Sequence, residues 1–184
     1  MAINAQFYGT VVEGDAYFAA RLHESAWTGA DPADRPKALL AATQIIDTLN
    51  FKGLKATVYA MLQNLGVETV ENAIGYGYLT AAQVYAAELA QPLEFPRGAD
   101  TVVPEAIRRA TYEIAHALLD GRDPDFEMEA IGIKSHKYAN VATEYQRDHT
   151  PIEHLIHGVV SMTAWQLLKP FLRDDEVIRL NRVS

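Results

Sequence analysis

The sequence predicts a mostly α-helical protein: a small helical bundle with a β-hairpin and an extended C-terminal tail. Several segments repeat apolar residues every three or four positions between glycine, proline or capping residues, which is typical of packed helices. A later segment changes to a two-residue period, which indicates paired strands. The 184 residues suit one domain, residues 1–184, better than two.

Two helices are expected before residue 54. Residues 15–26 form the first, because apolar side chains recur every four positions at Phe18, Leu22 and Ala26. The second begins at Asp34, a typical N-cap, with Pro36 tolerated in its first turn. It ends before Gly53, and its apolar face consists of Leu39, Ala42, Ile46 and Leu49.

Residues 54–90 are less regular. Residues 55–65 are expected to form a helix that ends at Gly66, and Gly75 and Gly77 then interrupt the pattern. Residues 80–90 are rich in alanine, with Thr80 as the candidate cap, so a further helix is expected there.

The clearest helix follows Pro104 and ends at Gly121. Its apolar face consists of Ile107, Ala110, Thr111, Ile114 and Leu118. The charged residues Arg108, Arg109 and Glu113 are expected to lie away from the centre of that face.

Residues 131–145 predict the β-hairpin. Apolar residues alternate with small or polar ones at 131–134 and again at 141–145, on either side of a polar turn at residues 135–140. Two strands alone are marginally stable, so the hairpin must pack on helices or on a neighbouring chain. Thr150 and Glu153 then form a capping box that opens a last helix, which ends near Pro170.

The composition narrows the kinds of site and partner that this protein can have. The chain has no cysteine, which excludes disulfides, a cysteine nucleophile and thiolate metal sites, and fits a reducing cytoplasm. A net charge of −8 makes another protein the expected partner rather than nucleic acid. We expect no signal peptide and no membrane partner, because the apolar runs are far shorter than the ~20 residues that span a bilayer.

We also expect no catalysis, no cofactor and no metal. Gly75 and Gly77 suggest a dinucleotide fingerprint, but Thr80 occupies the place of the third glycine and no strand precedes them. The densest group of potential metal ligands does not match a zinc-protease motif, and a metal would need a further ligand from elsewhere. That group consists of His149, Glu153, His154 and His157.

Two segments are candidate contact sites. The expected tip of the hairpin is basic and aromatic, with Lys134, His136, Lys137 and Tyr138. Such a tip suits a protein contact, or a nucleic acid through phosphate contacts and base stacking. The tail, residues 173–184, mixes basic and aliphatic side chains, which suits a segment that orders on docking. Its candidate contacts are Arg173, Val177, Ile178, Arg179, Leu180, Arg182 and Val183.

The order of several segments resembles one family. The segments are residues 15–21 with Trp27, residues 37–53, the Leu-Glu-Phe-Pro-Arg-Gly run at 93–98, residues 103–115, and residues 132–135 with 144–145. In this order, and followed by the last helix and the tail, they resemble the head–tail connector proteins (adaptor or head completion proteins) of tailed bacteriophages. That family is often labelled DnaT-like single-stranded DNA-binding.

The resemblance implies a structural virion protein that is not an enzyme. Copies would form a homo-oligomeric ring, usually a dodecamer, beneath the portal protein at the head–tail junction, after assembly in the host cytoplasm. The ring would extend the DNA channel, let genomic DNA pass without specific binding, and offer a platform to a tail or nozzle protein. The tail at 173–184 is then the candidate portal contact. The alternative function is a single-stranded DNA-binding replication accessory protein.

Residues 54–90 depart from the family pattern. They make the link between residues 51–53 and 93–98 longer than is usual in the family. We expect an inserted helical excursion that contacts the phage tail or a neighbouring subunit.

Overall fold

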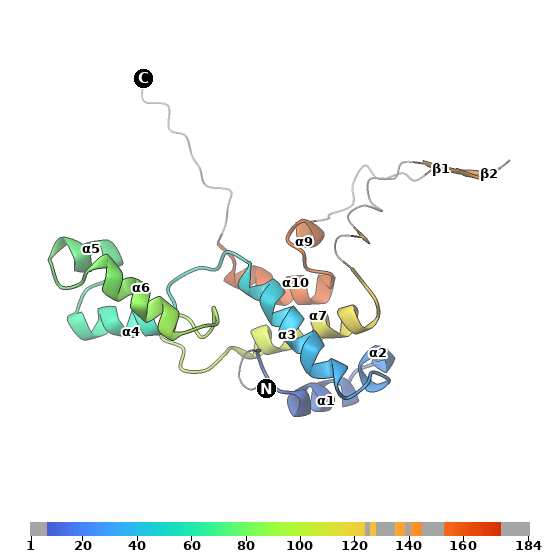
Figure 1. Cartoon of the computed structure of the whole chain (residues 1–184), viewed down its shortest axis with the longest axis horizontal. Helices are drawn as coiled ribbons and strands as arrows, with labels where there is room; N and C mark the ends of the chain where they lie inside the picture. Colours follow the sequence, from blue (N-terminus) through green and yellow to red (C-terminus); the bar gives the residue numbers. More distant parts are fainter. Residues whose placement is uncertain (1–6, 124–125, 128–134, 139–140, 145–152, 174–184) are drawn as a thin grey trace, which may run out of the picture.

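The computed structural model describes residues 7–123, 126–127, 135–138, 141–144 and 153–173 (Figure 1). This part of the chain is mostly helical, as the sequence predicts. Its helices are α1 (Val11–Ala19), α2 (Ser25–Thr28), α3 (Asp34–Asp47), α4 (Ala56–Leu65), α5 (Val70–Gly75), α6 (Ala81–Ala90), α7 (Glu105–Leu119), α9 (Glu153–Ile156) and α10 (Met162–Leu168), followed by the 3-10 turn η1 (Lys169–Phe171).

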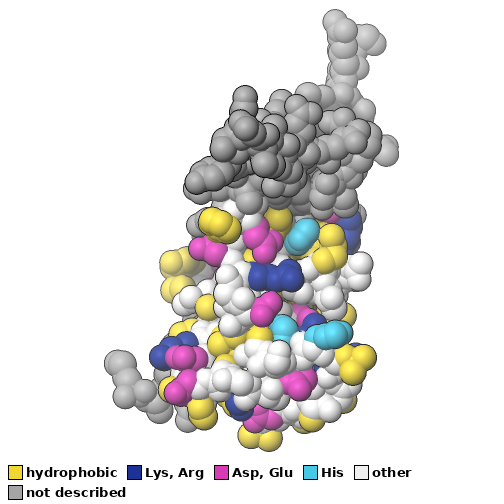
Figure 2. Space-filling model, turned by 90° about the vertical axis from the view of Figure 1, so that its right-hand side faces the viewer, with side chains coloured by type: hydrophobic (Ala, Val, Ile, Leu, Met, Phe, Trp, Pro, Cys, Tyr) yellow, Lys and Arg dark blue, Asp and Glu magenta, His cyan; other side chains and the backbone are white. Residues whose placement is uncertain are grey.

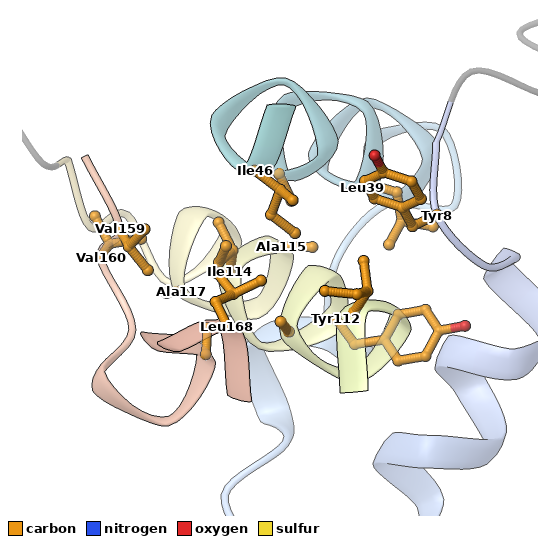
Figure 3. Close-up of a cluster of buried hydrophobic side chains, with 14 of the residues drawn as sticks. Tyr8, Leu39, Ile46, Tyr112, Ile114, Ala115, Ala117, Val159, Val160 and Leu168 are labelled. Carbon is orange, nitrogen blue, oxygen red and sulfur yellow. The ribbon is translucent and has the colours of Figure 1, made fainter. Parts of the chain in front are cut away.

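The main body is built around α7, which packs against both α3 and α10. Figure 3 shows Ile46 of α3 and Leu168 of α10 approaching Ile114 of α7, and all three side chains are fully buried. Helices α1 and α2 also pack on α7. They contribute Phe18 and Trp27, whose rings stack with centroids 5.0 Å apart.

The apolar face expected for α7 is confirmed. Ile107, Ala110, Thr111 and Ile114 are buried, and Leu118 is partly buried against the same core. Glu113 lies on a flank of this face, away from its centre, but its side chain is buried and only 3% exposed. The chain of α1 and the turn after it cover that flank of α7, where Tyr17 and Arg21 bind the Glu113 carboxylate.

Helices α4, α5 and α6 form a second, smaller body, which we call the insertion unit (residues 54–90). Figure 1 shows it at one end of the molecule, apart from the bundle of α3, α7 and α10. Two expected boundaries are confirmed: Gly66 ends α4 with φ +68°, and Thr80 forms a capping box with Gln83 at the start of α6. Its core consists of Val58, Leu62, Ala73, Leu79 and Val84.

Two helices expected to be continuous are interrupted, and one cap is misplaced. Residues 15–26 span the end of α1 and the start of α2, with His23 at φ +58° in the turn between them. The last helix breaks after α9, where Gly158 has φ +73°, and Ser161 caps α10. Asp34 lies in the first turn of α3 and is not its N-cap, a position that Ala33 occupies.

The segment expected to form the hairpin is described in part. Strand β1 (Ser135–Tyr138) pairs antiparallel with β2 (Val141–Glu144), with Ser135 opposite Glu144 and Tyr138 opposite Val141. The predicted turn at 135–140 is therefore too long, since its first four residues lie in β1. Residues 131–134, which were expected in the first strand, are outside the described residues.

Candidate interaction surfaces

The chain leading into the C-terminal tail pairs with the segment after α3. The Lys52 amide donates to the Phe171 carbonyl and the Arg173 amide donates to the Asn50 carbonyl, both at 2.9 Å. These bonds fix the point at which the tail begins, and the Arg173 side chain there is exposed. The remaining predicted contacts of the tail lie outside the described residues: Val177, Ile178, Arg179, Leu180, Arg182 and Val183.

The predicted hairpin tip lies only partly within the described residues. His136, Lys137 and Tyr138 belong to β1, so their backbone lies along a strand. Lys134 lies outside the described residues. The contact predicted for these four residues stays a prediction.

The segment at 93–98 lies at the junction of the two bodies, where the Gly98 amide donates to the Leu54 carbonyl at 2.8 Å and the Ala56 amide donates to the Pro96 carbonyl at 3.1 Å. The Phe95 ring is 3% exposed and packs edge-on against Phe51 and Phe171, with centroids 4.7 and 5.7 Å away. The Arg97 guanidinium donates to the Lys52 and Gly53 carbonyls and pairs with Glu94. These contacts give the aromatic and basic side chains of the segment a role in stabilising the fold.

A groove of about 700 Å³ runs between α1 and α7, lined by charged and phenolic side chains. At its base the Glu113 carboxylate accepts from the Tyr17 hydroxyl at 2.6 Å and lies 2.9 Å from Arg21 Nη2. Arg108 pairs with Glu13 at 2.7 Å near its rim. Three arginines and three glutamates line the groove, so it has no net formal charge.

Two tyrosines of this groove keep their protons at neutral pH. Burial, reinforced by the Glu113 carboxylate, raises the pKa of Tyr17 to about 12. Burial and the negative charge of Glu13 raise the pKa of Tyr112 to about 12. Both phenols therefore act as hydrogen-bond donors. Since each already donates to a glutamate, neither hydroxyl is free to donate to a bound anion.

Two of the candidate metal ligands have other contacts, whereas His154 Nδ1 is buried without a hydrogen-bond partner among the described residues. Glu153 Oε2 accepts from Lys169 at 3.1 Å, which holds the pKa of Glu153 below its usual range. The His157 ring stacks on Trp165 with centroids 5.1 Å apart. His149 lies outside the described residues. Within the described ranges, no group of three or more His, Asp or Glu is positioned to hold a metal ion.

The insertion unit has an unusually apolar surface. Six of the twelve large hydrophobic side chains that are exposed in the described part of the chain belong to it: Leu65, Ile74, Tyr76, Tyr78, Tyr85 and Leu89. Sequence reasoning missed this surface. The signal was present in residues 81–90, where apolar residues occupy nearly every position and so leave no polar face for solvent.

Basic and acidic side chains are mixed on one face of the described part of the chain. On the face in Figure 2, the lysine and arginine side chains lie beside aspartates and glutamates. Ion pairs among the described residues include Arg35 with Asp15 and Lys55 with Glu94, both at 3.1 Å. Within the described residues, none of the helices has the length and apolar character needed to cross a membrane.

Comparisons with protein-family models, with curated proteins and with solved structures find no match for this chain.

Proposed function

We propose that this protein is a head–tail adaptor of a tailed bacteriophage. Copies of it form a ring beneath the portal protein, extend the DNA channel and provide the platform on which the tail docks. The role is structural, without catalysis or a cofactor. The proposal rests on the ordered set of sequence segments that resemble this family.

One observation supports the proposal most. The segments that resemble the adaptor family and the segment that departs from its pattern have separate hydrophobic cores. Residues of the resembling segments pack into one cluster, among them Phe18, Ile46, Phe95 and Ile114. Residues 54–90 build their own cluster around Leu62. The insertion of a helical excursion into an existing adaptor body would produce two separate cores of this kind, because the body would keep its complete core without the excursion.

The tail is the proposed portal contact. It begins at a point fixed by the Arg173–Asn50 backbone bond. Beyond that point its sequence mixes Arg179 and Arg182 with aliphatic residues, a combination that is frequent at the centres of protein interfaces. The strands β1 and β2 are the proposed hairpin contact with a neighbouring subunit or the tail, since an isolated pair of strands is marginal.

The charge of the chain suits passage of DNA without binding. A net charge of −8 repels the phosphate backbone, whereas proteins that hold DNA neutralise phosphates with clustered lysine and arginine. An acidic channel lining would let the genome slide through the ring.

A truncation tests the portal contact. The shortened chain ends at Arg173, so it keeps the backbone bond to Asn50 and should fold like the full chain, as circular dichroism checks. We expect it to lose co-sedimentation with the portal protein encoded in the same genome. Unchanged portal binding by the truncated chain would contradict the tail as the contact.

A DNA-binding assay tests the alternative function. We expect no gel shift of single-stranded DNA at physiological salt. A shift whose affinity falls steeply with salt, together with no association with the portal, would replace the adaptor with a single-stranded DNA-binding accessory protein.

A further inference from the structure

Helix α6 has two apolar faces, of which the protein itself covers only one. Val84 points into the core of the insertion unit and is 8% exposed. On the opposite face Tyr85 and Leu89 are each 63% exposed, and Ala82 and Ala86 lie beside them at helical spacing. We call these four residues the α6 ridge. A helix that is apolar all round is normally buried, so the ridge lacks its covering partner in the single chain.

Helix α4 borders a groove of about 650 Å³ on its outer side. Val58 and Leu62 point inward to the core of the unit, whereas Ala56, Tyr59, Ala60 and Gln63 face the groove. The segment from Pro96 to Thr101 forms the opposite wall. We call this site the α4 groove. Its lining contains methyl groups, an aromatic ring and amides, with Asp100 as its one charged residue.

The ridge and the groove lie on different sides of the insertion unit. Helices α4 and α6 pack on each other through their inner faces, and the Thr57 hydroxyl donates to the Ala87 carbonyl at 2.8 Å. Because both surfaces face away from the shared core, one chain cannot fill its own groove with its own ridge. Each copy therefore presents both halves of a possible contact.

We infer that the α6 ridge of one copy docks into the α4 groove of the next copy. The chemistry of the two surfaces matches: the ridge offers a tyrosine, a leucine and small residues, and the groove offers apolar walls with the Gln63 and Asn64 amides as partners for the Tyr85 hydroxyl. This inference adds a contact between subunits to the proposed function. It rests on the proposed function only for the closure of repeated contacts into a ring.

The lack of basic side chains disfavours a nucleic acid as the occupant. No lysine or arginine occurs between residues 56 and 93. The ridge carries no charge and Asp100 is the one charged residue of the groove lining, so a second copy would meet the groove through apolar and amide groups with little charge repulsion. The contact is heterologous, since different surfaces meet, and a repeated heterologous contact generates a ring when its rotation closes.

Disulfide trapping tests the contact in the full chain, because the natural sequence has no cysteine to give a background. One variant is Leu89→Cys on the ridge, and the other is Ala60→Cys in the groove. We expect the 1:1 mixture to give a disulfide-linked heterodimer under mild oxidation, and each variant alone to remain largely uncrosslinked. Homodimers of Leu89→Cys, or no crosslinking in the mixture, would overturn the inference.

Affinity measurement gives a second test. Tyr85→Ala is expected to raise the dissociation constant for self-association about 30-fold, as for a central aromatic contact. The matched control is Tyr76→Ala, which removes a 66% exposed tyrosine outside the ridge and should leave the constant unchanged. Equal effects of the two variants in analytical ultracentrifugation would contradict the ridge as the contact.

Portal binding by the same variants separates this inference from the proposed function. Normal association with the portal but no heterodimer would refute the ridge-in-groove contact and leave the adaptor role standing. A heterodimer without any portal association would support the contact and refute the adaptor role.

Discussion

Trp27, Ile46, Ile107 and Ile114 of the main body are fully buried, whereas three of the four tyrosines of the insertion unit, Tyr76, Tyr78 and Tyr85, lie on its surface. The main body covers its core with α1, α2, α3 and α10 packed around α7. The insertion unit has three short helices and five buried residues in its core. A unit of this size buries too little apolar surface to be strongly stable by itself.

The difference indicates how stability and binding are divided in this protein. The main body gains its stability internally, from a closed core and from half-buried ion pairs such as Arg21–Glu113. The insertion unit is held by contacts at its base and, in our inference, by docking on another copy. Changes in the main body should therefore affect global unfolding, and changes in the unit should affect local opening and association.

Removing the largest buried side chain of the main body should have the largest effect. Trp27→Ala leaves a cavity against Phe18 and removes the indole bond to Asp15, which measures 2.8 Å. We expect a loss of about 3–5 kcal/mol in the free energy of unfolding, measured by denaturant titration. The control Leu22→Ala changes an 82% exposed side chain and should cost less than about 0.5 kcal/mol. A loss for Trp27→Ala as small as that of the control would contradict the assigned core.

A matching truncation in the insertion unit should act locally. Leu62→Ala empties the centre of the small core and should cost the unit about 2–5 kcal/mol. Hydrogen exchange is expected to accelerate at the amides of α4, α5 and α6 while α3 and α7 keep their protection. Equal acceleration in α7 would mean that the two bodies unfold as one.

Loss of the Arg97 contacts should loosen the junction between the bodies. Arg97→Ala removes a charged donor from the Lys52 and Gly53 carbonyls, and we expect a cost of about 1.5–3 kcal/mol. The control Arg109→Ala breaks an exposed pair with Glu105 within one helix and should cost less than about 0.5 kcal/mol. Thermal unfolding of both variants measures the difference, and equal costs would refute the role given to Arg97.

The smallest effect concerns pH. Burial, with the Arg21 charge adding to it, holds the pKa of His116 below its usual range. The unfolded chain then binds a proton more readily than the folded chain, so stability falls as the pH drops through the unfolded pKa of about 6.5 toward the lower folded value. His116→Phe keeps a ring beside Phe18 and should remove this part of the pH dependence. An unchanged dependence in the variant would assign it to other groups.

Much of the helical fold follows from local signals in the sequence. The face of α7, the end of α4 at Gly66 and the Thr80 cap of α6 were predicted because each depends on residues close together in the chain. The breaks after α1 and α9 were missed, because apolar periodicity continues across His23 and Gly158 while the backbone turns there. The burial of Glu113 was missed because its partners, Tyr17 and Arg21, come from α1 and the turn after it.

The contact surfaces were harder to predict than the fold. Basic and aromatic residues were taken as the mark of a contact site in the sequence. This criterion selected a hairpin tip that includes residues of β1. The basic residue Arg97 and the aromatic residue Phe95 are used inside the fold. The apolar ridge of α6 consists of ordinary helix-forming residues, and only its exposure in the folded chain distinguishes it from core.

The adaptor role is tested most directly by cryo-electron microscopy of this protein mixed with the portal protein of the same genome. We predict a ring of copies seated on the portal, with the chain beyond Arg173 ordered against a portal subunit. Portal particles that show no bound copies at any salt concentration would contradict the adaptor role.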